Sequence, residues 1–254
     1  MSDFDRNYGM AAREVGASRT VVTDVGLRAY MIRVYNYMAM GVGLTGIVAW
    51  LTFQTAVMTD ANGTIIELTP FGHAIFGGPA TIVLMLGTFG LVMFISFRIQ
   101  HFRPTTALAL FITYAALLGL MLSSVFLAYT GASVTRVFFT SAASFGALSL
   151  YGYTTQRDLS AFGSFLLMGM FGLLIAMAVN IFVKSTGLDL VISAVGVLIF
   201  AAMTAWDTQR IKEMYDPMQD ATVVGRKAVM GALQLYLDFI NLFLFLLRFF
   251  GDRR

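Results

Sequence analysis

The sequence contains no cysteine, two histidines and four prolines among its 254 residues. Without cysteine there is no disulfide framework, no thiolate nucleophile and no thiolate-bound metal. His73 and His101 are too few for a histidine-based metal site. Charge is also scarce, because 12% of the residues are charged against about 25% in an ordinary soluble domain. These shortages exclude a soluble globular enzyme, a disordered chain and a nucleic-acid-binding module.

Apolar residues take the place of the missing charge. They make up 58% of the chain, and the mean hydropathy is +0.77. A helix needs about 20 apolar residues to cross a bilayer, and the runs found here are too long and too uniformly apolar for barrel strands. The sequence therefore predicts an all-α integral membrane protein with seven transmembrane helices. The seven runs are residues 31–53, 79–97, 105–129, 134–153, 161–183, 188–206 and 229–250.

Polar residues divide the chain into two parts. Residues 1–28 are polar and of mixed charge, lack the features of a signal peptide, and are predicted to form a loose N-terminal tail. Residues 29–254 then form a single seven-helix transmembrane domain. Lysine and arginine concentrate in the tail and in the second, fourth and sixth loops, which places the N-terminus in the cytoplasm by the positive-inside rule. Arg248, Arg253 and Arg254 conflict with that rule if the last run crosses fully, so crossing and re-entry of this run both stay open.

Ionisable residues inside apolar runs are costly in hydrocarbon and mark candidate functional sites. Asp238 lies in the middle of the last run, and Gln234 and Asn241 share its helical face. The last helix is therefore predicted to carry a polar stripe inside an apolar shell. Asp207 lies near the cytoplasmic end of the sixth run, with Arg210 three residues further on.

The two aspartates are predicted to meet if the last two helices form a hairpin that brings them to similar depth. Two poorly solvated carboxylates in contact cannot both ionise cheaply, so they share a proton and respond to pH. Two plainer interpretations stay open, with Asp207 paired to Arg210 at a helix end and Asp238 acting as a structural hydrogen-bonding residue. Arg98, at the cytoplasmic end of the second run, either joins the pair or snorkels to water.

Catalytic motifs are missing from the sequence. It has no G-x-S-x-G elbow, no H-E-x-x-H helix and no P-loop, and no lysine deep in a run that could form a retinal Schiff base. The sequence therefore predicts no enzyme and no cofactor. It favours a channel, a transporter or a membrane-embedded regulator.

Three stretches resemble a known family. They are YGYTTQRDLSAFGSFLLMG at 151–169, AWDTQRI at 205–211 and LYLDFINLFLFLLRFFG at 235–251. Their order and spacing resemble the transmembrane Bax inhibitor motif family, which includes Bax inhibitor-1 and bacterial YccA-like members. The resemblance runs from about residue 28 to the end, and the last stretch is its most specific part.

The resemblance implies a fold in which six helices wrap a central seventh. It also implies a pH-sensitive calcium leak in which Asp207 and Asp238 form the pH sensor and ion gate, with Arg98 as a latch partner. Ionised carboxylates are oxygen ligands that calcium prefers, so the same two residues are predicted to bind Ca²⁺ transiently. Gln234 and Asn241 are predicted to line the route.

The resemblance and the two carboxylates also leave other functions open. Bacterial relatives are thought to restrain a membrane-anchored AAA+ protease, and the tail 1–28 would then be the handle that the protease engages. A transporter of protons or small molecules would use the same carboxylates. The predicted partners are the lipid bilayer, calcium ions and protons, with no nucleic acid. A bacterial inner membrane is the expected location.

Overall fold

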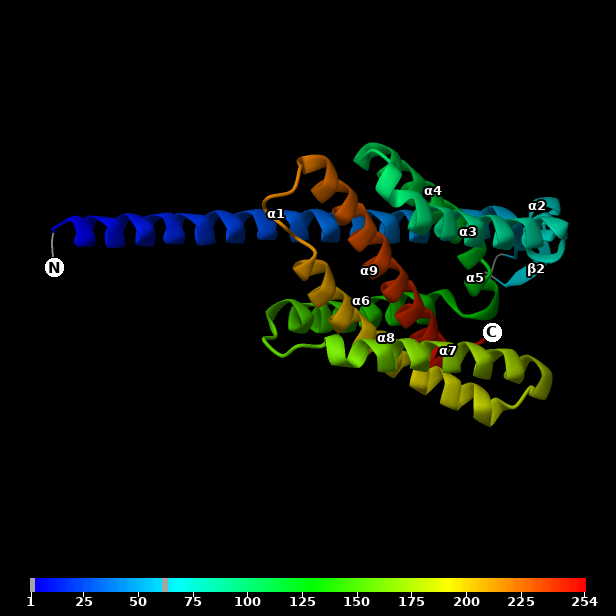
Figure 1. Ribbon diagram of the computed structural model, residues 1–254. Coiled ribbons are helices and arrows are strands. Elements are labelled where there is room, and N and C mark those ends of the chain that lie inside the picture. The colour runs from blue at the N-terminus through cyan, green and yellow to red at the C-terminus, as the bar shows by residue number, and fades with distance from the viewer. Residues whose placement is uncertain (1–2, 61–63) are drawn as a thin grey trace.

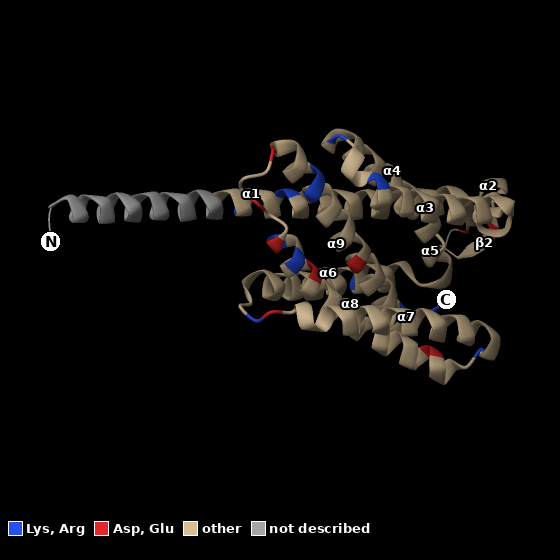
Figure 2. Cartoon of the chain, viewed as in Figure 1, with Lys and Arg blue, Asp and Glu red and all other residues tan. Residues whose placement is uncertain are grey.

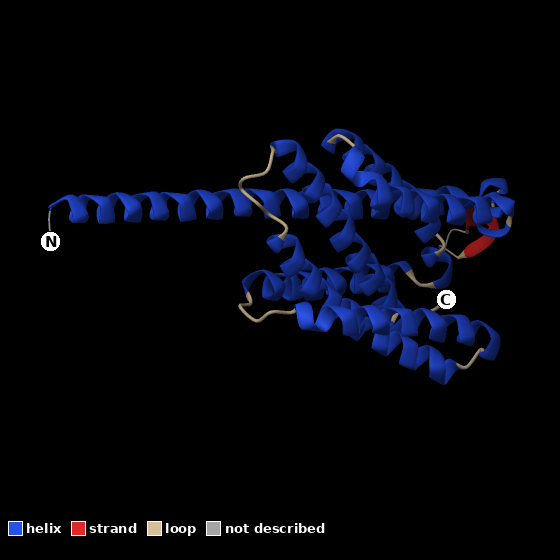
Figure 3. Cartoon of the chain, in the orientation of Figure 1, coloured by secondary structure: helices blue, strands red, loops and turns tan. Residues whose placement is uncertain are grey.

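Helices account for almost the whole chain (Figure 3). The computed structural model describes the backbone of residues 3–60 and 64–254 and the side chains of 25–60 and 64–254. In chain order the elements are α1 Asp3–Ala56, β1 Val57–Thr59, β2 Ile65–Leu68, α2 Pro70–Gly77, α3 Pro79–Arg98, the short 3-10 helix η1 Ile99–His101, α4 Pro104–Leu122, α5 Val125–Ala128, α6 Gly131–Thr154, α7 Ser160–Val183, α8 Thr186–Glu213 and α9 Ala221–Phe250.

Six helical segments of the described residues are long and apolar enough to cross a membrane. They are Val25–Ala56, Pro79–His101, Pro104–Ala128, Ser160–Val183, Thr186–Glu213 and Ala221–Phe250. The fourth predicted run, 134–153, lies in α6, which is richer in serine and threonine and is not among the six. The all-α membrane architecture is thus confirmed with six candidate spans, while a seventh crossing by α6 stays a prediction.

Helix α9 occupies the centre of the bundle. It passes between a layer that contains α1, α3 and α4 and a layer that contains α6, α7 and α8 (Figure 1), and 72% of its apolar window is buried. Its main packing partners are α1, α4, α6 and α8, whereas α3 packs on α2 and α4, and α7 packs on α8. Helix α9 is thus central, with α1, α4, α6 and α8 directly around it and α3 and α7 further out, while the full arrangement of six helices around the last one stays a prediction.

Aromatic side chains explain why α9 lies inside. Tyr236 meets the rings of Phe111 and Tyr114 edge-on, at centroid distances of 5.4 and 6.0 Å. Its hydroxyl shares a 2.6 Å hydrogen bond with Thr45. On the other side of the helix, Phe245 stacks on Phe200 at 5.6 Å. Contacts on both sides require a helix that is apolar around most of its circumference, as α9 is.

The N-terminal segment 1–28 differs from the prediction. Helix α1 begins at Asp3, so residues 3–28 continue the helix of the first span and do not form a loose tail. The first proline of the chain is Pro70, so nothing in the covalent structure of the backbone interrupts this helix. Residues 1–2 lie outside the described residues.

The C-terminus lies at the opposite end of the bundle from the turn between α8 and α9 (Figure 1). Helix α9 is continuous to Phe250, and the four residues after it pair with the connection between α5 and α6. The amide of Thr130 donates to the carbonyl of Asp252 at 3.1 Å, and the amide of Arg254 donates to that of Ala128 at 3.0 Å. The continuous α9 is long enough for a full crossing, which favours that topology over re-entry and stays a prediction.

Candidate functional site

Asp207 and Asp238 are both buried in the bundle, with 1% and 3% of their surface exposed. Asp207 lies six residues before the end of α8, and Asp238 lies seventeen residues after the start of α9. A strictly antiparallel hairpin would place them at different depths. They nevertheless meet, because α9 crosses α8 obliquely (Figure 1).

The two buried carboxyl groups lie close enough to act on each other, and they can share a hydrogen bond when one of them is protonated. The side-chain amide of Gln234 donates to Oδ1 of Asp207. Among the described residues, no donor reaches Oδ2 of either aspartate. Two carboxyl groups can hydrogen-bond only when one of them carries a proton, so this geometry fits a pair that holds one shared proton.

Arg210 is the charged residue nearest to the pair in sequence. Its guanidinium lies over the ring of Trp206, 5.4 Å from the centroid, and its side chain is exposed. It acts on Asp207 electrostatically, but the ion pairs of the described residues do not include one between them. The plain interpretation of Asp207 as a helix-end partner of Arg210 therefore does not account for its burial.

Arg98 lies away from the aspartates. It is exposed at the end of α3, on the periphery of the bundle, and no hydrogen bond or ion pair of the described side chains joins it to Asp207 or Asp238. The predicted latch is not formed in this conformation. The side chain that contacts Asp207 is Gln234 of α9, which donates a hydrogen bond to its Oδ1.

The polar stripe of α9 continues from the pair into a cavity of about 590 Å³. Asn241, one turn beyond Asp238, lines this cavity and donates to the carbonyl of Leu237 in its own helix at 2.8 Å. Arg248 lines the far end. Gln234, Asp238 and Asn241 thus form one polar face, as predicted, although Gln234 contacts Asp207 and not the cavity.

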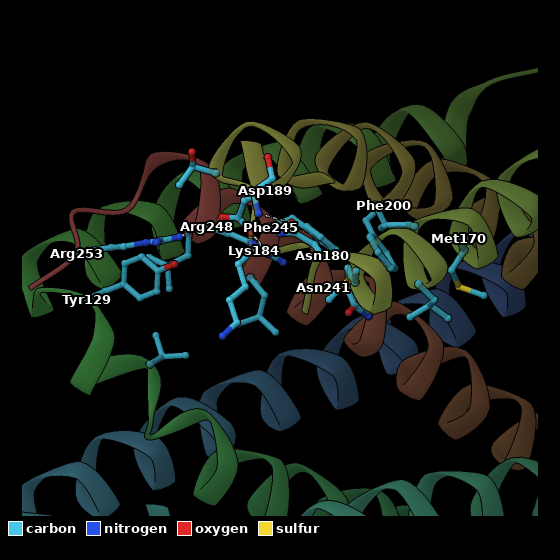
Figure 4. A pocket seen from close by; sticks show the side chains of 18 residues that line it. Tyr129, Met170, Asn180, Lys184, Asp189, Phe200, Asn241, Phe245, Arg248 and Arg253 are labelled. Carbon is cyan, nitrogen blue, oxygen red and sulfur yellow. Dashed lines mark hydrogen bonds and ion pairs between the residues drawn. The ribbon is translucent and has the colours of Figure 1, made fainter. Parts of the chain in front are cut away.

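Asp189 is a site residue that the sequence analysis missed. It lies in the first turn of α8, where it accepts hydrogen bonds from Arg248 and, at 3.2 Å, from Arg253 (Figure 4). A negative charge at a helix N-terminus is favourable, and Ser185 caps that end. The available signal was a carboxylate four positions after a capping serine, at the start of an apolar run. Asp189 neutralises part of the arginine cluster at the C-terminal end of α9.

Two other residues of the family-resembling stretches, Gln209 and Gly152, lie at contacts of α8 with its neighbours. Gln209 accepts from the amide of Leu159 and donates to the carbonyl of Arg157, both at 2.8 Å, which ties the α6–α7 loop to α8. A Cβ on Gly152 would lie 2.2 Å from the carbonyl oxygen of Ala205, so α6 approaches α8 at this point as only glycine allows. These motif residues position the helix that carries Asp207.

Charged side chains otherwise gather toward helix ends and turns (Figure 2). Among the described residues there is no group of three or more His, Cys, Asp or Glu that could hold a metal ion. A cation at the pair would therefore meet two carboxyl groups, which is fewer protein ligands than a resident calcium site has.

Comparisons with known proteins identify the same family that the three sequence stretches around this site resemble. The family described as "Inhibitor of apoptosis-promoting Bax1" matches residues 27–254. The chain is 42% identical to "Inner membrane protein YbhL" of Escherichia coli, over 90% of this chain and 94% of that protein. It is also 42% identical to the uncharacterized protein RP147 of Rickettsia prowazekii, over 93% and 95%, and to an uncharacterized protein of Caulobacter vibrioides, over the full length of both.

Proposed function

The chain belongs to the Bax inhibitor-1 family and, like YbhL, is an integral protein of the inner membrane; from that premise we propose that it is a pH-sensitive calcium leak. Asp207 and Asp238 are the proton-sharing gate, and calcium and protons are the ligands of that gate. The lipid bilayer surrounds the helices that carry the gate.

One observation carries the proposal, namely the buried contact between two carboxyl groups that have almost no other donors. A purely structural polar residue in a membrane bundle is normally satisfied by neighbouring helices. Here each aspartate keeps one buried oxygen, Oδ2, that no donor of the described residues reaches. The stability of the α8–α9 contact therefore depends on how many protons the pair holds, which is the property of a pH-dependent switch.

The sign of the pH effect follows from this contact. With one proton, the pair forms a charge-assisted hydrogen bond, which is stronger than a bond between neutral groups. A second proton removes the charge and weakens the tie between α8 and α9. Acidification is therefore expected to favour the open state, with ions passing along Asp238 and Asn241.

The described conformation is assigned to the closed state. The cavity beyond Asn241 is lined by Lys184, Arg248 and Arg253 and by the single acid Asp189. This excess of positive charge opposes the entry of a divalent cation. Opening therefore has to rearrange the outer end of α9 as well as separate the aspartates.

Calcium flux into dye-loaded proteoliposomes tests the proposal. Asp207→Asn and Asp238→Asn each replace one titratable carboxyl group of the pair with an amide, and are expected to alter both the flux and its dependence on pH. Asp158→Asn is the matched control, because Asp158 is an exposed carboxylate in the α6–α7 loop. Unchanged flux in both gate variants would refute the proposal. Calcium movement that requires a counter-gradient of protons would instead indicate a transporter.

The alternative of a non-conducting regulator of an AAA+ protease rested on a loose N-terminal handle. Helix α1 begins at Asp3, so the segment that a protease would engage is helical. Deleting residues 1–25 is expected to abolish any effect on protease substrates and to leave calcium flux intact. A change in protease substrate turnover without any flux in the full-length protein would favour the regulator.

A further inference from the structure

The cavity beyond Asn241 has two chemically different ends. Lys184, Arg248 and Arg253 line one end together with Asp189, and Met170, Leu173 and other apolar side chains of α7 and α9 line the other. Figure 4 shows Arg248 and Arg253 at one end of the cavity and Met170 at the opposite end. Its volume of about 590 Å³ lies within the range of ligand sites, about 300–1,000 Å³.

The charged end carries an excess of positive charge. Asp189 is the single acid that lines it and pairs with both arginines. Lys184 makes none of the ion pairs found among the described side chains, and 64% of the Arg253 side chain is exposed. Two cationic charges thus remain for an anionic ligand.

The apolar end lies beside the surface that faces lipid. Helix α7 packs on α8 and leaves its outer face bare, with Ile181 69%, Phe182 86% and Val183 59% exposed. Lys184 follows directly, at the end of the apolar helix, where membrane spans reach the headgroup layer. A molecule in the cavity therefore has hydrocarbon on one side and the headgroup region on the other.

We propose that this cavity binds an anionic phospholipid. Its phosphate would lie between Lys184 and Arg253, and the upper part of an acyl chain would lie against Met170, Leu174 and Met177. Basic pockets between transmembrane helices select anionic headgroups, and a guanidinium matches a phosphate with paired hydrogen bonds. A free phosphate ion would leave the apolar half of the cavity unused.

Native mass spectrometry of the full chain, titrated with phosphatidylglycerol, tests this proposal. The variant Lys184→Asn with Arg253→Gln removes the two exposed cations of the cavity. Asparagine suits position 184 because Lys184 has a φ of 53°, in the left-handed region that asparagine tolerates. At about 1 kcal/mol per cation, each substitution should weaken binding ~5-fold and the double variant ~25-fold. Arg157→Gln, an exposed cation in the α6–α7 loop, is expected to leave binding unchanged.

Two further measurements identify the ligand. Met177→Trp keeps every charge and fills the apolar part, so it should also weaken lipid binding. Phosphatidylcholine and inorganic phosphate should bind at least tenfold more weakly than phosphatidylglycerol. Equal binding of phosphatidylcholine, full competition by phosphate, or unchanged affinity in the double variant would each overturn the proposal. If the double variant does not fold, Lys184→Asn alone decides the question, since its side chain is exposed.

Discussion

Gln234 donates a hydrogen bond from α9 to Oδ1 of Asp207. Replacing it with leucine leaves Oδ1 of Asp207 without this donor, and is expected to destabilise the protein by about 1 kcal/mol. Thermal unfolding of the purified protein in detergent measures the change. Asn241→Leu is the control, because Asn241 bonds only to the carbonyl of Leu237 in its own helix. Equal losses in the two variants would mean that the Gln234 contact has no special weight.

Asp158 is a surface acid outside the proposed gate, so its substitution shows whether ordinary acids contribute to the pH response. The backbone amide of Ser160 donates to Asp158 at 2.8 Å, and this hydrogen bond lowers the pKa of Asp158 below its usual value. A carboxyl group whose pKa is lowered in the folded protein stabilises the fold at any pH above its pKa in the unfolded chain, about 3.9. This stabilisation is lost as the pH falls from there through the lower pKa of the folded state. Between pH 5 and 8 it stays ionised. Asp158→Asn is therefore expected to leave the pH profile of calcium flux unchanged, and a shifted profile would implicate loop acids.

At the scale of elements, the close approach of α6 to α8 decides where Asp207 lies. In Gly152→Ala the new methyl would meet the backbone of Ala205 at 2.2 Å, and backbone cannot turn aside as a side chain can. Overpacking of this kind costs about 1–3 kcal/mol, so the melting temperature should fall. Gly146→Ala in the same helix meets no atom within 4 Å and should be neutral or slightly stabilising. Equal melting temperatures for the two variants would contradict this packing.

The elements also show what the sequence could predict. Long apolar runs predict where helices lie, so α9 could be predicted. An aspartate in such a run is costly to place in hydrocarbon and is therefore a site candidate, so Asp207 and Asp238 could be predicted as well. For Arg98 the sequence left a latch and a snorkelling side chain open, because a helix end cannot reveal which neighbours its helix packs against, and its exposure agrees with the second. Asp189 was missed because its partner Arg248 lies 59 positions further along the chain. Tertiary pairing over such distances leaves no local pattern.

At the scale of the whole molecule, the number of crossings is open to direct measurement. Helix α6 has 24 residues, enough to span about 36 Å at 1.5 Å per residue, and its packing on α8 and α9 supports a crossing. Since the chain has no cysteine, single cysteines introduced at Ala132 and Gln156 report the two ends of α6 without background. A thiol reagent that cannot cross the membrane should label them from opposite sides. Labelling from the same side would exclude the seventh span.

The central claim is that proton number on the aspartate pair controls a calcium leak. The most direct measurement is calcium entry into dye-loaded proteoliposomes between pH 5 and 8, comparing the native chain with Asp238→Asn. The account predicts a leak that increases as pH falls in the native chain, and a variant whose flux no longer follows pH. No leak at any pH, or the same pH profile in both proteins, would contradict it and leave the aspartates as part of the bundle's architecture.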